Sequence, residues 1–224
     1  MTRAKEYPAD HVAQSIATYD AIAEHYHVTA TPELRAWKEA SMRRFAEYLS
    51  GKRVLVPGCG DGRDSRFLSS LGLAVISFDL SRGMLAAARE SDPHGAYLQM
   101  DLRDMASLEG PYDGIWASGC LYHLTKAEFT RCVASCRSLL AAGGVLYLTM
   151  KEGRAERYED TPGPRYPGGA KARELLRGRR FYAYYERAEL LGILRGFELL
   201  HEQRVVPSEG GFELWLRRSA EPAS

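Results

Sequence analysis

Three glycines and an acid carry the strongest chemical signal in this 224-residue sequence. Gly58, Gly60 and Gly62 follow an apolar run, and a second apolar run ends in Asp79, 21 residues after Gly58. Glycines at this spacing let a turn backbone approach a ligand closely at the start of a helix. A carboxylate at that distance suits the two hydroxyls of a ribose. The pattern therefore predicts a ribonucleoside site. A plain strand-to-helix turn and a helix-terminal acid are the simpler alternatives.

Further polar residues follow later apolar runs. Asp101 comes directly after residues 96–100, with Asp104 as a competing acid. Ser118 ends the next run, at residues 114–118, and His123 follows five residues later. Histidine titrates near neutral pH, so His123 is a candidate general base with a near-neutral pKa. Packing against the ligand and capping of the next helix are the alternatives for His123.

Strand-like and helix-like segments alternate through the middle of the chain and must position these residues. Predicted strands cover residues 53–56, 74–79, 96–100, 114–118 and 145–150, and predicted helices cover residues 64–71, 83–90 and 126–140. Alternation of this density predicts an α/β fold, a doubly wound parallel sheet with helices on both faces. Two earlier helices are predicted, at residues 11–26 and from Pro32 to Leu49 with Thr31 as N-cap.

The pattern changes after residue 150. Residues 151–187 hold ten Lys or Arg against six Asp or Glu and show poor periodicity, which predicts a functional lid or a mobile segment. A helix at residues 186–195 and an antiparallel hairpin of residues 197–206 and 212–217 should close the fold. The terminal residues 219–224 are expected to be a disordered tail.

Composition limits the classes of function. A formal net charge of +1 and 45% hydrophobic residues suit a globular protein with no general affinity for polyanions. The four cysteines have no zinc spacing, and no metal site is predicted. Neither a leader sequence nor a membrane span is expected, so we expect reduced thiols and a cytoplasmic location.

The ordered set of motifs resembles the class I S-adenosylmethionine-dependent methyltransferases. The resemblance rests on V-L-V-P-G-C-G-D-G at residues 54–62, Asp79, M-D-L at 100–102, Y-D-G-I-W at 112–116 and L-A-A-G-G at 140–144. It implies a seven-stranded, mostly parallel Rossmann-like sheet with a C-terminal antiparallel hairpin. It divides the chain into an N-terminal helical lid (1–50) and a methyltransferase domain (51–218) with an acceptor-side insertion (151–187). Val56 departs from the family, which usually has an acid there.

The resemblance also implies roles for individual residues. Asp61 and Asp64 would repel a diphosphate but tolerate a cationic sulfonium, which favours S-adenosylmethionine over a dinucleotide. Asp79 would bind the ribose, Asp101 the adenine amino group, and the N-terminal aromatic residues the sulfonium through cation–π attraction. Core packing is the alternative for the apolar members of the set. The predicted cofactor-binding residues are Tyr19, Tyr26, Gly58, Cys59, Gly60, Gly62, Arg63, Asp79, Leu80, Met84, Asp101, Leu102 and Ser118.

The acceptor side is expected to involve aromatic residues. His123 and Tyr122 are the catalytic candidates, and Trp37, Tyr182, Tyr184 and Tyr185 are the substrate-binding candidates. The predicted function is methyl transfer from S-adenosylmethionine to an O or N atom of a small molecule, as in natural-product biosynthesis, with S-adenosylhomocysteine as product. A tRNA or rRNA methyltransferase and a non-catalytic cofactor-binding regulator are the alternatives. We expect a monomer or homodimer.

Overall fold

The computed structural model describes residues 10–29, 31–162, 169–205 and 210–219. The expectation of a disordered tail therefore falls almost entirely outside the described residues. The described strands form a nine-stranded sheet in the order β3-β2-β1-β4-β5-β7-β6, with β9 also pairing with β5 and β8 pairing with β9. The strands are β1 (Arg53–Pro57), β2 (Ala74–Asp79), β3 (Ala96–Gln99), β4 (Tyr112–Ala117), β5 (Leu140–Glu152), β6 (Glu156–Thr161), β7 (Gly178–Tyr185), β8 (Phe197–Arg204) and β9 (Gly211–Arg218).

The predicted seven-stranded, mostly parallel sheet is confirmed within this larger one. Strands β1 to β5 run parallel, and β9 lies antiparallel to both β5 and β8. The two additional strands, β6 and β7, come from the segment that was expected to be a lid or mobile loop. They form an antiparallel ribbon, and β7 extends the sheet through parallel pairing of Lys151 with Tyr184 and of Glu152 with Tyr185.

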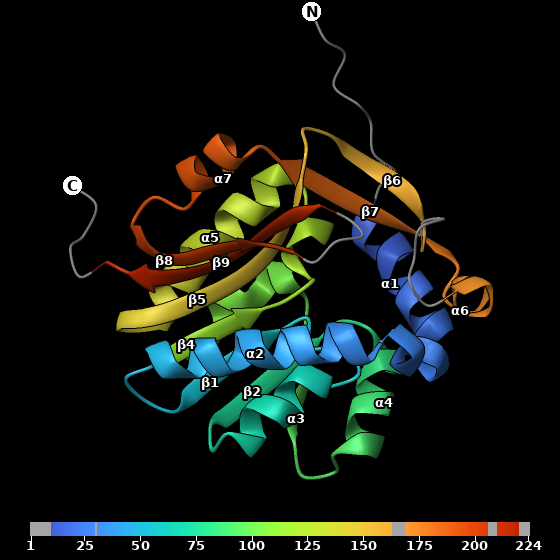
Figure 1. Ribbon diagram of the computed structural model, residues 1–224, viewed down its shortest axis with the longest axis horizontal. Coiled ribbons are helices and arrows are strands. Elements are labelled where there is room, and N and C mark those ends of the chain that lie inside the picture. Colours follow the sequence, from blue (N-terminus) through green and yellow to red (C-terminus); the bar gives the residue numbers. More distant parts are fainter. Residues whose placement is uncertain (1–9, 30, 163–168, 206–209, 220–224) are drawn as a thin grey trace, which may run out of the picture.

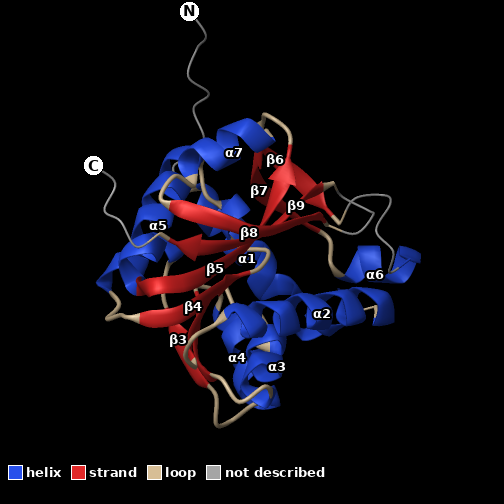
Figure 2. Ribbon diagram, turned by 60° about the vertical axis from the view of Figure 1, so that its left-hand side comes forward, coloured by secondary structure: helices blue, strands red, loops and turns tan. Residues whose placement is uncertain are grey.

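Helices cover both faces of the sheet (Figures 1 and 2). They are α1 (His11–Ile22), α2 (Pro32–Tyr48), α3 (Arg63–Ser70), α4 (Arg82–Ser91), α5 (Lys126–Leu139), α6 (Gly169–Leu175) and α7 (Arg187–Ile193), with the 3₁₀ segments η1 (Ala23–Thr29), η2 (Leu102–Ser107) and η3 (Leu121–His123). The first predicted helix thus ends as an α-helix at Ile22 and continues as a 3₁₀ turn.

Side-chain alternation along the central strands divides the core into two layers. Ile115 and Leu146 pack toward α5 and α7, whereas Trp116 and Tyr147 pack toward α2 and α3. The latter two rings stack with centroids 3.5 Å apart, and Phe45 of α2 closes over both of them. The two-residue period of a strand explains why neighbours in sequence serve opposite layers.

Local signals define several helix starts. The Thr31 side chain accepts a hydrogen bond from the Leu34 amide, with Pro32 at the first helical position. Thr125 and Glu128 form a reciprocal capping box at the start of α5. The helix ends at Leu139, one residue earlier than predicted, because β5 already begins at Leu140.

Candidate active site

One pocket of about 750 Å³ lies beside the C-terminal ends of β1, β2, β4 and β5. Its volume is typical of small-molecule sites. Most of the residues selected from the sequence line it, namely Tyr19, Tyr26, Trp37, Gly58, Cys59, Gly60, Arg63, Asp79, Leu80, Met84, Asp101, Leu102, Ser118, Tyr122, His123 and Tyr182. The fold therefore brings residues from α1, the glycine turn and the late strand β7 to one cavity.

The glycine turn requires its glycines. Gly58, Gly60 and Gly62 have φ values of 60°, 54° and 73°, which L side chains rarely adopt. A Cβ at Gly58 would lie 2.4 Å from the Cβ of Cys120. Gly62 does not line the pocket; it is the left-handed N-cap of α3, and a Cβ there would meet the Tyr97 hydroxyl at 2.7 Å. The turn thus stays narrow and presents its backbone to the cavity.

Asp79 links the end of β2 to this turn. Its two carboxylate oxygens accept hydrogen bonds from the Gly60 and Ser81 amides, each at 2.9 Å. Burial raises the pKa of Asp79, and these backbone donors oppose the shift. Each carboxylate oxygen can accept a further hydrogen bond. Asp79 is therefore both a brace for the turn and an acceptor facing the pocket.

Two further acids at this end, Asp61 and Asp64, are paired with cations. Asp61 binds Arg63 at 2.9 Å, and Asp64 binds Lys38 at 3.1 Å and the Trp116 indole at 2.9 Å. Neither Lys38 nor the buried role of Asp64 was anticipated from the sequence. The adjacent cation and indole donor lower the pKa of Asp64 despite its burial. Both carboxylates beside the turn are thus paired with a cation.

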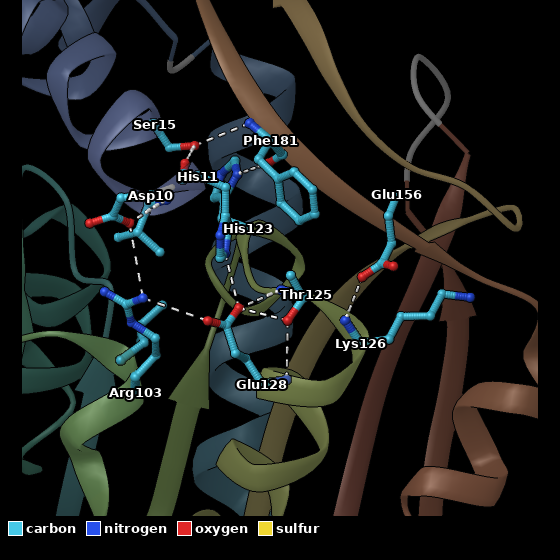
Figure 3. Close-up of polar contacts among 12 residues, drawn as sticks. Asp10, His11, Ser15, Arg103, His123, Thr125, Lys126, Glu128, Glu156 and Phe181 are labelled. Atoms are coloured by element: carbon cyan, nitrogen blue, oxygen red, sulfur yellow. Dashed lines mark hydrogen bonds and ion pairs between the residues drawn. The ribbon is translucent and has the colours of Figure 1, made fainter. Parts of the chain in front are cut away.

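Asp101 is held by its own neighbour. Its carboxylate accepts hydrogen bonds from the Arg103 amide at 2.8 Å and from the guanidinium at 2.6 and 3.0 Å. Arg103 also reaches Asp10 and Glu128, while His11 contacts Glu128 at 2.9 Å (Figure 3). The start of α1 is thereby tied to the loop that follows β3.

His123 forms a hydrogen-bonded chain across the pocket wall. Its Nδ1 lies 2.7 Å from the Phe181 carbonyl oxygen, and its Nε2 lies 2.8 Å from the Tyr19 hydroxyl. Because a carbonyl only accepts, Nδ1 carries the hydrogen, and Nε2 accepts from Tyr19. Burial lowers the pKa of His123 to about 3. The near-neutral pKa expected from the sequence is therefore wrong, and the imidazole is neutral at physiological pH.

The Tyr19 and Tyr26 rings pack edge to face with centroids 6.1 Å apart, and the Tyr26 ring lies 3.7 Å from where a Cβ at Gly60 would be. Burial raises the pKa of Tyr26 to about 12 and also raises the pKa of Tyr19, so both hydroxyls stay protonated. The Arg180 guanidinium lies over the Tyr19 ring, 4.6 Å from the ring centroid. The cation–π interaction that Tyr19 makes is thus with this arginine.

Two of the predicted substrate residues lie outside the pocket. The Tyr184 hydroxyl donates to Glu159 on β6 at 2.7 Å, and Tyr185 packs on Phe129 in the core. Strand alternation explains the difference, because Arg180 and Tyr182 share the pocket face of β7, whereas Phe181 and Tyr185 point into the core. Tyr184 is on the same face of β7 as Tyr182, but it lies further along the strand, where its hydroxyl reaches β6 rather than the pocket.

Two cationic residues beside Tyr182 in the pocket, Lys151 and Arg180, were not predicted from the sequence. Lys151 is the second-last residue of β5, and its Nζ lies 4.7 Å from the Tyr182 ring centroid and 5.6 Å from that of Tyr122. Arg180 lies on β7 beside Tyr19 and Tyr182. The position of Lys151 directly after a predicted strand was a usable signal. No comparable signal existed for Arg180, because β7 was not recognised as a strand.

Among the described residues, no cluster of histidine, cysteine and acidic side chains has the arrangement of a metal site. The four cysteines are free and buried. None of the helices in the described ranges has the length and apolar character needed to cross a membrane.

A family profile described as "Methyltransferase domain" matches residues 54–144, the part that includes the glycine turn, Asp79 and Asp101. The fold around that part is the one the resemblance implied. Over these residues the chain is similar to methyltransferase domains, in line with the resemblance of its motifs to the class I S-adenosylmethionine-dependent methyltransferases.

Relatives and solved structures agree with this assignment. The chain is 32% identical over 158 residues to a ubiquinone biosynthesis O-methyltransferase of Xanthomonas oryzae. The aligned region covers 67% of this chain and 64% of that protein. It is 34% identical over 121 residues to an uncharacterized protein of Synechococcus, covering 50% of this chain. The chain spans only 28% and 64%, respectively, of the Synechococcus and Xanthomonas proteins.

Two solved structures share the fold over nearly the whole chain. The DhpI–SAM–HEP complex superposes with a TM-score of 0.73 at 23% identity, covering 95% of this chain and all of that one. The CcbJ methyltransferase from Streptomyces caelestis superposes with a TM-score of 0.70 at 19% identity, covering 91% and 98%. At these identities the likeness concerns the fold.

Proposed function

We propose that this protein transfers the methyl group of S-adenosylmethionine to an O or N atom of a small molecule. The observation that carries the proposal is the single pocket that joins the glycine turn and Asp79 at one end to His123 and Tyr182 at the other. Binding both reactants in one cavity would align the nucleophile with the methyl group, which is the main requirement of such a transfer.

The residues at the glycine-turn end fit the cofactor. Gly58 has a positive φ, and a Cβ at this position would lie 2.4 Å from Cys120. Only glycine fits there, so the turn presents its backbone to the pocket without a side chain. Asp79 would accept from the ribose hydroxyls, with Leu80 and Met84 against the adenine. Asp101 would accept from the adenine amino group while it stays bound to Arg103. When bound, S-adenosylmethionine supplies a methyl group activated by a sulfonium.

His123 and Tyr19 would orient the acceptor. The Nε2 atom of a neutral imidazole accepts a hydrogen bond, and an incoming hydroxyl or amine would share or replace the Tyr19 hydroxyl as its donor. A pKa of about 3 makes His123 a weak proton acceptor, so we assign it orientation of the nucleophile rather than full proton abstraction. Tyr182 would line the acceptor cavity beside it.

Ion pairing argues against an RNA substrate. Arg154, Arg157 and Arg187 of the basic segment pair with Glu186, Glu159 and Glu202. Their charges are therefore partly neutralised within the protein rather than offered as a phosphate-binding patch.

Calorimetry with S-adenosylmethionine and S-adenosylhomocysteine tests the proposal. We expect both to bind, and Asp79→Ala to weaken binding about tenfold or more through loss of charge-assisted hydrogen bonds. Asp104→Ala is the matched control, since this exposed acid does not line the pocket. Absence of binding to the wild type would reject the proposal. Binding without turnover of any acceptor would leave the regulator alternative.

A further inference from the structure

We propose that the methyl acceptor carries an acidic group, a carboxylate or phosphate-like oxyanion, and that Arg180 binds this group. The inference rests on the proposed function, because it concerns the acceptor of the same pocket. It goes further by assigning the acceptor's chemical class and the residue that selects it.

Arg180 is a buried cation that no acidic side chain of the described residues neutralises. The residue is 8% exposed and lines the pocket. Its guanidinium lies over the Tyr19 ring, interacts with the Tyr182 side chain and donates to the Leu176 carbonyl at 3.4 Å. Its Nε has no hydrogen-bond partner. Across the described ranges of the chain, no carboxylate forms an ion pair with Arg180.

This arrangement is costly unless an anion completes it. A guanidinium stays charged at any physiological pH, and a buried charge needs a counter-charge or full hydrogen bonding. Tyrosine rings and one carbonyl provide only part of that compensation. The nearby acids are committed elsewhere, since Asp61 and Asp64 have their own cations and Asp79 holds backbone amides. A bound oxyanion would satisfy the free Nε–H and neutralise the charge.

The position of Arg180 assigns the anion to the acceptor. Arg180 comes from β7, the strand whose Phe181 carbonyl holds His123, and not from the turn and strand ends that carry Asp79 and Asp101. Lys151, 9% exposed, adds a second cation to the same wall, against the Tyr122 and Tyr182 rings. The pocket thus has paired acids at one end and a cationic, aromatic wall at the other. Such a wall suits an aromatic or otherwise planar acid.

Benzoate is the probe for this wall, with benzamide as its uncharged counterpart. We expect the protein saturated with S-adenosylhomocysteine to bind benzoate in calorimetry, and benzamide to bind at least about tenfold more weakly. Arg180→Met should weaken benzoate binding by about the same factor, and Arg180→Lys should retain part of it. Arg179→Met is the matched control, because this neighbouring arginine is exposed and lies over Tyr158 on the ribbon.

A second titration separates the acceptor's acid from the carboxylate of the cofactor. Methylthioadenosine has the nucleoside and sulfur of S-adenosylhomocysteine without its amino-acid end. If Arg180 held the cofactor carboxylate, Arg180→Met would weaken S-adenosylhomocysteine binding but spare methylthioadenosine, and this result would overturn the proposal. Equal binding of benzoate to Arg180→Met and wild type would also overturn it.

The proposal and the proposed function fail in different ways. Failure of the wild type to bind S-adenosylhomocysteine rejects the cofactor assignment, whereas a wild type that binds S-adenosylhomocysteine but not benzoate rejects the acidic acceptor. Circular dichroism and melting temperature establish that each variant is folded. If Arg180→Met does not fold, Arg180→Lys and Arg180→Gln are compared instead. The lysine variant keeps a positive charge and is expected to bind benzoate more tightly than the glutamine variant.

Discussion

The two walls of the pocket are built in different ways. The wall formed by the glycine turn comes from one contiguous stretch, in which β1 leads through Gly58, Gly60 and Gly62 into α3. The opposite wall is assembled from α1, η3 and β7, which are more than 50 residues apart in the sequence. The Phe181 amide donates to the Ser15 hydroxyl at 3.1 Å (Figure 3), and His123 bridges Tyr19 and the Phe181 carbonyl.

The two walls depend on different interactions. Backbone conformation specifies the glycine wall, since positive φ and close packing exclude side chains there. Side-chain hydrogen bonds between distant elements specify the acceptor wall. Changes in the glycine wall should therefore affect stability and cofactor binding together, whereas changes in the acceptor wall should affect the acceptor and leave the fold intact.

The largest effect is expected from Gly58→Ala. A positive φ and a 2.4 Å contact with Cys120 combine there, so the free energy of unfolding should fall by about 3 kcal/mol or more. Gly143→Ala is the matched control, because Gly143 has φ of 73° but nothing within 4 Å of a Cβ. This control should lose only about 1 kcal/mol. Urea unfolding measures both, and equal losses would show that the contact with Cys120 is unimportant.

An intermediate effect is expected from Tyr19→Phe. The substitution removes the hydrogen-bond donor to His123 Nε2 but keeps the ring under Arg180. We expect kcat/KM to fall about tenfold with any acceptor that the wild type methylates, and the melting temperature to change little. Tyr184→Phe is the control, because that hydroxyl bonds Glu159 outside the pocket. An equal loss of rate in Tyr184→Phe would contradict the division between the two walls.

The smallest effect concerns pH. Burial lowers the pKa of His123 from 6.5 to about 3, so between these values the unfolded chain binds a proton that the folded chain does not. The stability associated with neutral His123 is therefore complete above about pH 6.5 and declines as the pH falls below it. His123→Gln lacks this titration, so its deficit in melting temperature relative to wild type should shrink between pH 8 and pH 5. A constant deficit would mean that His123 is not buried as described.

Much of the fold was predictable because its signals are local. Thr31 and Thr125 cap their helices, Asp79 ends its strand, and the period of the apolar residues distinguishes strand from helix. The ribbon of β6 and β7 was not predictable. Four of the six residues of β6 are charged, and β7 has two arginines followed by aromatic residues, so neither strand shows a two-residue alternation; they become regular only by pairing with each other and with β5.

The candidate site divides along the same line. The sequence by itself determined the glycine turn, Asp79 and the Rossmann-like order of elements, because backbone sterics and short-range spacing suffice to define them. Only the tertiary structure decided that Tyr182 faces the pocket while Tyr185 lies in the core, that His123 is buried and neutral, and that Arg180 meets Tyr19. These properties depend on the register and packing of β7 against α1, and contacts between residues so far apart leave no local pattern in the sequence.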